Sequence, residues 1–200
     1  MKKNTMLISA AVLSMALGIT GAYAYYTAQT KTVENTFNIV AGGGESGDAV
    51  GTVEEVFDPI SAKDLEPRAT FKKDVKIDSN VDYSSHAYLF VTVPNINARL
   101  KDQTAKEYQD AVTLDINTLN WELVKSTKGD GSTPSKYLYR YKSVLAADAA
   151  TESLFTTATV PDFVECEALA GTIDVTGYMI SSTNVSAADA DADAIANYFK

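Results

Sequence analysis

Apolar and polar residues alternate along much of the chain in short segments, which is the pattern of β-strands with one or two covered faces. In the clearest segment, HAYLFVTVP at 86–94, residues of both parities are apolar, so we expect both faces to be covered. Turn formers separate the segments, and the predicted strands cover residues 27–41, 50–57, 71–77, 86–94, 112–116, 119–123, 137–141, 154–161 and 172–180. Strands at this spacing predict an all-β fold, an antiparallel sandwich or barrel.

Two connections between these strands have their own character. The segment STKGDGSTPS at 126–135 is rich in turn formers and predicts a hairpin loop. Residues 96–110 are more polar, with Leu100, Ala105 and Tyr108 as weak apolar anchors, and predict a short helix or an excursion loop.

The C-terminal segment changes from a strand period to a helical one. Ser186 is a candidate N-cap, and three acidic residues follow near the positive end of the helix dipole. We expect one terminal helix at about 186–199 that docks a small apolar face on the sandwich, formed by Ala188, Ala192, Ile195, Ala196 and Phe199.

The N-terminal segment has the order of an export signal. Lys2 and Lys3 precede an apolar stretch of about fourteen residues, shorter than the roughly twenty that span a bilayer. A small-x-small pattern at Ala22 and Ala24 predicts cleavage before Tyr25, and an uncut signal-anchor is the alternative. The predicted location is therefore outside the cell, in an extracellular matrix or at the cell surface, with membrane contact only before cleavage.

Behind the predicted cleavage point lies a β-prone segment followed by glycines. Val33, Phe37 and Ile39 share one face of the predicted strand, and Gly42, Gly43 and Gly44 form a candidate hinge. A phosphate-binding loop does not fit, because no Gly-Lys-Ser/Thr follows and the flanking charge is acidic. The predicted organisation is a signal peptide at 1–24, an N-terminal strand with its hinge at 25–48, and a β-sandwich domain at 49–200 that includes the helix.

Charge narrows the classes of partner. Without residues 1–24 the chain keeps 15 Lys and Arg against 26 Asp and Glu, a net charge of −11. Nucleic-acid binding needs Lys and Arg to displace counterions, so this balance argues against a nucleic-acid partner.

Candidate chemistry is sparse. His86 is the only histidine, which argues against a zinc site or a Ser-His-Asp triad, and Cys166 is the only cysteine. Asp189, Asp191 and Asp193 have calcium-loop spacing, but Ala194 and Lys200 stand where glycine and glutamate are needed. We therefore predict a solvated acidic helix face, no metal or other cofactor, and no catalytic residue. The tyrosines at 137, 139 and 141 predict cross-strand packing or, alternatively, a carbohydrate-binding surface.

Several segments in order resemble the TasA/camelysin family of exported bacterial proteins. They are the aromatic start AYYT, the strand VENTFNI, the segment FKKDVKIDSNVDYSSHAYLFVTVP, and then LNWELV, YLYRY, ESLFTTATVP, GTIDVTGYMI and DAIANYF. The resemblance covers nearly all of the chain after the signal.

The resemblance implies a jelly-roll β-sandwich that is processed by a SipW-type signal peptidase. It also implies a structural, non-enzymatic role in biofilm matrix filaments, in which the N-terminal strand of one subunit fills a groove in the next. The expected partners are other copies of this chain, related matrix subunits and the signal peptidase. Two alternatives stay open: a camelysin-like exported metalloprotease, and a monomeric surface binding module or adhesin that uses the tyrosines.

Overall fold

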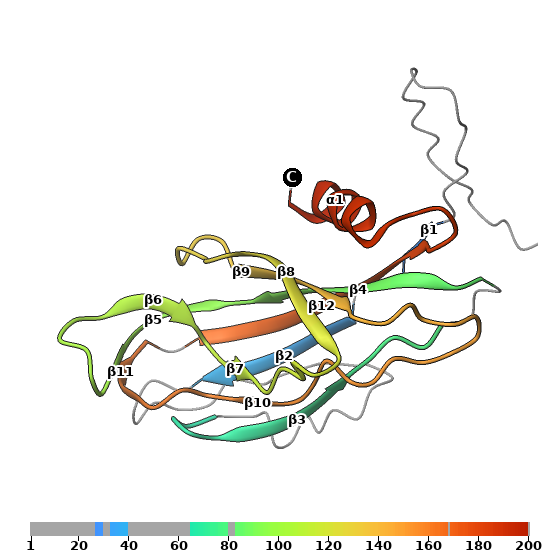
Figure 1. Ribbon diagram of the computed structural model, residues 1–200. Helices are drawn as coiled ribbons and strands as arrows, with labels where there is room; N and C mark the ends of the chain where they lie inside the picture. Colours follow the sequence, from blue (N-terminus) through green and yellow to red (C-terminus); the bar gives the residue numbers. More distant parts are fainter. Residues whose placement is uncertain (1–26, 30–32, 40–64, 80–82, 168, 200) are drawn as a thin grey trace, which may run out of the picture.

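The computed structural model describes residues 27–29, 33–39, 65–79, 83–167 and 169–199 (Figure 1). Within these residues the chain forms strands and a C-terminal helix, in the order β1 (Thr27–Gln29), β2 (Val33–Ile39), β3 (Thr70–Val75), β4 (Ser85–Val93), β5 (Asn95–Leu100), β6 (Glu107–Asp110), β7 (Thr113–Leu114), β8 (Trp121–Thr127), β9 (Ser135–Tyr141), β10 (Phe155–Thr159), β11 (Phe163–Cys166), β12 (Leu169–Ser181) and α1 (Ala187–Tyr198).

The strands form three antiparallel sheets. The large sheet has the order β1-β12-β4-β9-β8, and β2 pairs with β12 on the same side as β1. Two three-stranded sheets, β3-β10-β7 and β11-β5-β6, complete the fold. The prediction of an all-β, antiparallel fold with a C-terminal helix is confirmed.

The main core lies where one face of the large sheet meets the two smaller sheets. Leu89 and Val91 of β4 pack there with Ile173 and Val175 of β12. The smaller sheets contribute buried residues from four of their strands, namely Phe71, Val75, Ile96, Ala98, Phe155, Ala158 and Phe163. The period of two along each strand brings these side chains to a common interior.

The opposite face of the large sheet is covered by the helix (Figure 1). Ala190 and Ala194 of α1 are fully buried, and they pack in a second apolar cluster with Tyr88 of β4 and Tyr178 of β12. β4 therefore has apolar residues of both parities because both of its faces are covered, as the sequence predicted.

The helix begins as its sequence indicates. Ser186 has an extended backbone, and its Oγ accepts a hydrogen bond from the backbone N–H of Asp189 at 3.2 Å. This N-cap satisfies a backbone donor that the first helical turn leaves without a partner.

Two short strand regions differ from the sequence-based expectation. The prediction of a helix or loop at 96–110 was wrong, because Asn95–Leu100 and Glu107–Asp110 pair as a β-hairpin. β11 was not predicted, because its four residues give only one buried apolar side chain, Phe163, before the flanking acids. Short strands of this kind form where tertiary packing outweighs weak local preference. The predicted strand at 50–57 lies outside the described residues.

Candidate functional site

The predicted N-terminal strand lies along one edge of β12, and it pairs there in two pieces. Thr27 to Gln29 oppose Ile180 to Tyr178, and Val33 to Ile39 oppose Val175 to Leu169. In this register the three candidate strand residues Val33, Phe37 and Ile39 have Val175, Gly171 and Leu169 as their backbone partners. The structure thus brings these three residues together with the last strand of the chain.

Strand β12 is an interior strand only because of this N-terminal segment. On its other side it pairs with β4 over Asp174–Ser181, and on this side its partners among the described residues are β1 and β2. Without them, β12 would present a row of unpaired backbone N–H and C=O groups, which is a template for another strand.

The other edge of the large sheet is built differently. β8 forms that edge, and its pairing with β9 is interrupted by a bulge between Leu123 and Lys125. Glu122 and Lys125 add charge along it. Bulges and charged side chains are the features by which edge strands avoid pairing with a second chain. The two edges are therefore unequal, since one carries these protective features and the other is occupied by a strand from the N-terminus.

The cleavage residues Ala22, Ala24 and Tyr25 and the hinge glycines Gly42, Gly43 and Gly44 all lie outside the described residues.

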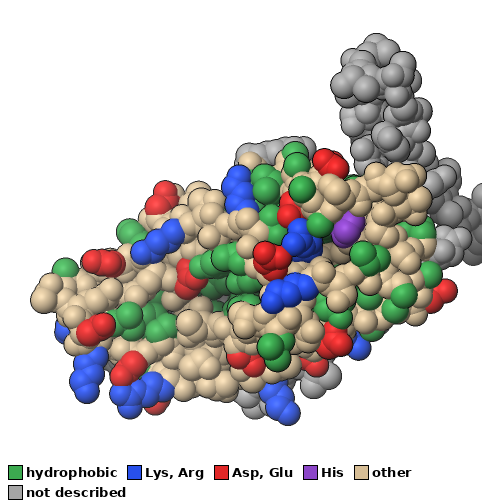
Figure 2. Space-filling view, viewed as in Figure 1, with side chains coloured by type: hydrophobic (Ala, Val, Ile, Leu, Met, Phe, Trp, Pro, Cys, Tyr) green, Lys and Arg blue, Asp and Glu red, His purple; other side chains and the backbone are tan. Residues whose placement is uncertain are grey.

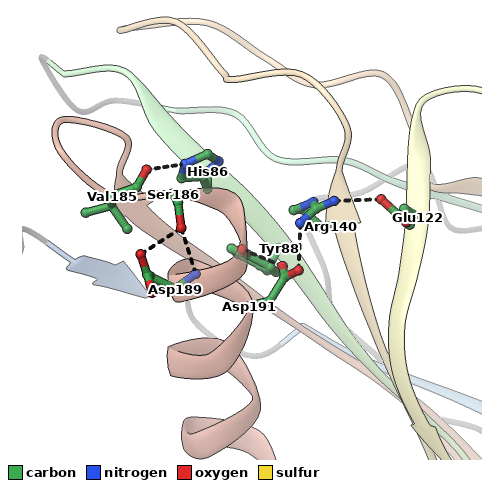
Figure 3. Close-up of polar contacts among 8 residues, drawn as sticks. All are labelled: His86, Tyr88, Glu122, Arg140, Val185, Ser186, Asp189 and Asp191. Carbon is green, nitrogen blue, oxygen red and sulfur yellow. Dashed lines mark hydrogen bonds and ion pairs between the residues drawn. The ribbon is translucent and has the colours of Figure 1, made fainter.

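A polar network connects α1 to the large sheet. Asp191 points from the helix toward β4 and β9, where it accepts hydrogen bonds from the Tyr88 hydroxyl at 2.9 Å and from Arg140 Nη1 at 2.6 Å (Figure 3). Arg140 also donates to Glu122 at 2.6 Å, which brings β8 into the network. Two residues further along the helix, Asp193 accepts a hydrogen bond from the Tyr178 hydroxyl of β12.

The tyrosines in this network are held neutral. Burial, and then the hydrogen bond to Asp191, raises the pKa of Tyr88. Burial and the hydrogen bond to Asp193 raise the pKa of Tyr178 in the same way. Each phenol therefore stays a donor to its carboxylate across the physiological pH range.

Sequence reasoning missed this network. It interpreted the aspartates at 189, 191 and 193 as one solvated face, which was wrong for two of them, because Asp191 and Asp193 bind tyrosine hydroxyls of the sheet. A signal existed in Tyr88 and Tyr178, since a buried tyrosine hydroxyl needs a hydrogen-bond partner. The hydrogen bond between Tyr88 and Asp191 joins residues 103 positions apart, and no local sequence pattern encodes such a contact.

A second polar cluster ties the β5-β6 hairpin to β9. Asp110 accepts hydrogen bonds from Asn95 Nδ2 at 3.0 Å, from Ser135 Oγ at 2.5 Å, and from the Tyr137 hydroxyl. The adjoining β8-β9 loop packs on the same hairpin. At Gly131 the backbone has φ +88°, and a Cβ atom there would lie 2.2 Å from the Tyr108 ring, so this turn requires glycine.

The tyrosines on β9 face inward. Tyr139 is 8% exposed and belongs to the main core, while Tyr137 and Tyr141 pack against it. The hydroxyls of Tyr137 and Tyr141 donate to Asp110 and Glu152. This arrangement favours cross-strand packing over an open carbohydrate-binding surface.

His86 has a structural contact. It is 8% exposed, and its Nε2 lies 3.0 Å from the carbonyl oxygen of Val185, in the segment that leads into α1. Among the described residues no group of three or more His, Cys, Asp or Glu side chains could hold a metal ion.

Charge is mixed on the surface. On the face shown in Figure 2, acidic and basic side chains are interspersed, without a continuous basic stripe. The part of the chain that the structure describes contains no helix with both the length and the apolar character needed to cross a membrane.

Comparisons with known proteins do not place the chain in a family. No protein-family model, no curated protein and no solved structure matches it. Its function must therefore be argued from the sequence and from the geometry of the β12 edge.

Proposed function

We propose that this protein is a secreted structural subunit of extracellular matrix filaments of the TasA/camelysin type. In this proposal the chain forms a jelly-roll sandwich after signal cleavage, and the glycines at 42–44 let the N-terminal strand leave its own domain. The strand then pairs with β12 of the next subunit. The observation that carries the proposal is that β1 and β2, the first described strands, occupy the edge of β12, the last strand.

This edge is suited to exchange because the N-terminal strand is held on one side only. Among the described strands, β1 and β2 pair with β12 alone, so their departure leaves every other strand pairing of the sheet in place. An identical strand from a second copy restores the same backbone hydrogen bonds in the same register.

The N-terminal strand can pair with β12 of its own domain or with β12 of a second copy, and the balance between these two states depends on protein concentration. Because the exchanged contacts are the same, a strand tethered to its own domain competes with the strand of a second copy, and the tether gives its own strand an effective concentration that the second copy must approach. Head-to-tail exchange gives an open filament when the rotation between subunits does not close a ring, and this open product is the one proposed here. We therefore expect assembly to begin where secreted protein accumulates, as it does in a matrix.

The test is a cysteine pair in the observed register. Val33 and Val175 are direct backbone partners, and directly opposed residues in antiparallel strands have Cα atoms about 4.5 or 5.5 Å apart, which a disulfide can bridge. The variant is Val33→Cys/Val175→Cys in a chain of residues 25–200 with Cys166→Ser. Val33→Cys alone in the same background is the matched control.

Oxidation of the monomer is expected to lock the strand in its own domain and to prevent filaments in electron micrographs. Oxidation after assembly is expected to join neighbouring subunits, giving a ladder of covalent oligomers on a denaturing gel. Filaments whose disulfides are all intramolecular would contradict strand donation. So would a chain starting at Gly42 that assembles as well as the chain starting at Tyr25.

A further inference from the structure

The C-terminal helix and the N-terminal strand meet at one short stretch of β12. Residues Tyr178–Ile180 pair with β4 on one side and with all of β1, Thr27–Gln29, on the other. Tyr178 and Ile180 are also members of the apolar cluster beneath α1. Tyr178 and Ile180 thus belong both to the end of the N-terminal strand's binding site and to the helix's binding site, whereas Met179 between them faces the main core.

Close packing holds the helix against this stretch. Ala190 and Ala194 are 0% exposed, and because their side chains are small, the helix lies directly on the rings of Tyr88 and Tyr178. Tyr178 donates to Asp193 and accepts a hydrogen bond from Asn197 Nδ2 at 3.3 Å.

The end of the helix is held by aromatic contacts. The Tyr198 ring stacks on Phe90 with ring centres 4.7 Å apart, and Phe199 meets the same ring edge-on at 5.7 Å. The Lys125 ammonium lies 4.8 Å from the centre of the Phe199 ring. β4 and β8 therefore hold the C-terminal end of α1, and β12 holds its middle.

The segment between β12 and α1 also forms hydrogen bonds with residues at the start of β4. Ser182 N–H donates to the Ser84 carbonyl at 2.9 Å, and His86 Nε2 is 3.0 Å from the Val185 carbonyl. His86 is the backbone partner of Ile180 in the β4-β12 pairing. The docked helix and this short connection thus both lie against the end of β12 and its β4 neighbours.

The helix itself is suited to a two-state change. It has 12 residues, and an isolated helix shorter than about 12–15 residues is marginal in water. It has no basic residue in its last turn to interact favourably with the helix dipole. Its stability therefore comes mainly from docking, so loss of docking and loss of helix are expected to occur together.

We propose that α1 is a clamp on the N-terminal strand: when α1 is docked, it orders Tyr178–Ile180 as a partner for β1, and when α1 undocks, the strand is released from that end. Release begins at β1, whose whole pairing lies opposite these three residues, and then spreads to β2. The role of this release in filament assembly rests on the proposed function, whereas the coupling itself is a property of the monomer.

The test compares two alanines of the helix in the chain of residues 25–200. Ala194→Glu places a charge in the buried contact with the sheet, whereas Ala192→Glu places the same charge on an exposed position of the same helix. Hydrogen exchange of the monomer is measured by mass spectrometry. We expect amides of Thr27–Gln29 and Val33–Ile39 to exchange at least about tenfold faster in Ala194→Glu, with β3 and β10 unchanged.

Equal exchange of the N-terminal strand in Ala194→Glu and Ala192→Glu would overturn the proposal. If β3 and β10 also lose protection in Ala194→Glu, the decision passes to Tyr178→Phe, which removes only the hydroxyl contacts to Asp193 and Asn197. Faster exchange of the N-terminal strand in that variant supports the clamp, and unchanged exchange overturns it.

Filament assembly is recorded separately for the same variants. If neither Ala192→Glu nor the parent chain assembles, the proposed function fails, while the exchange result still decides the coupling. If the parent chain assembles, Ala194→Glu is expected to assemble with a shorter lag.

Discussion

Four carboxylates in this protein accept hydrogen bonds that join two elements or organise a turn. Asp110 of β6, and Asp191 and Asp193 of α1, accept from tyrosine hydroxyls on strands of the large sheet. Asp130 instead organises its own loop, because its Oδ1 accepts from the backbone N–H and the hydroxyl of both Ser132 and Thr133. In these four aspartates the carboxylate is therefore a structural acceptor.

Asp130 predicts a loss of stability in acid. Hydrogen bonds from Ser132 and Thr133 lower the pKa of Asp130 to about 2, from 3.8. Because the folded pKa is the lower one, the stabilisation is complete above about pH 4 and is lost as the pH falls toward about 2. Asp130→Asn is expected to make the free energy of unfolding depend less on pH between about pH 4 and about pH 2. The measurement is urea titration at several pH values. Asp102→Asn, in the exposed β5-β6 loop, is the matched control, and an equal effect of both substitutions would contradict the prediction.

Elements differ in how strongly local sequence specifies them. The cap and the period of the helix placed it at Ala187–Tyr198 as expected. The predicted apolar face was wrong for its alanines, because Ala188, Ala192 and Ala196 are exposed and the buried alanines are Ala190 and Ala194. The β5-β6 hairpin depends more on what packs around it, because β6 has Tyr108 as its one apolar residue, although Ile96, Ala98 and Leu100 alternate along β5. Asp110, Ser135 and Asn95 hold that hairpin to β9.

The cap of the helix can be tested alone. Ser186→Ala removes the acceptor for the Asp189 N–H, and loss of such a cap typically costs about 1 kcal/mol. We expect the free energy of unfolding to fall by about that amount, and amide exchange in α1 to accelerate. Thr183→Ala, at an exposed position of the preceding connection, serves as control. A Ser186→Ala chain as stable as this control would show that docking makes the cap redundant.

At the scale of the whole molecule, buried tyrosines on both faces of the large sheet link its stability to pH. Burial raises the pKa of Tyr139, in the main core, to about 12, with a further contribution from the charge of Asp110. Burial also raises the pKa of Tyr198, at the C-terminal end of α1, to about 12. Ionisation of a tyrosine hydroxyl is therefore opposed on both faces of the large sheet.

This predicts a loss of stability in alkali. Because the folded pKa values lie above the ordinary 10.0, the tyrosines stabilise the fold fully below about pH 10, and this contribution is lost as the pH rises toward about 12. The measurement is the free energy of unfolding by urea titration from about pH 8 to about pH 12.

Tyr198→Phe isolates the part of this alkaline loss of stability that comes from Tyr198. The buried Tyr198 hydroxyl has no hydrogen-bond partner among the described residues, so the substitution is expected to leave stability at neutral pH unchanged or slightly higher. The alkaline loss should become smaller. Tyr108→Phe, at a position 47% exposed, is the control that should keep the parent's alkaline loss.

The local sequence was enough to predict the all-β class, the positions of most strands, the β8-β9 hairpin and the capped terminal helix. Each of these follows from a hydrophobic period, a turn former or a cap within about 15 neighbouring residues, so a short stretch of sequence is enough to predict it. The same is true of the β-prone segment at 27–41, which pairs as Thr27–Gln29 and Val33–Ile39.

Tertiary packing decided the rest. It set the edge on which the N-terminal strand lies, the register that places Phe37 opposite Gly171, and the contacts of Asp191 and Asp193 with Tyr88 and Tyr178. It also made strands of Glu107–Asp110 and Phe163–Cys166, whose own patterns are weak. The physical reason is that these features join segments from opposite parts of the chain, and their energy comes from burial and pairing that exist only once the sheets have met.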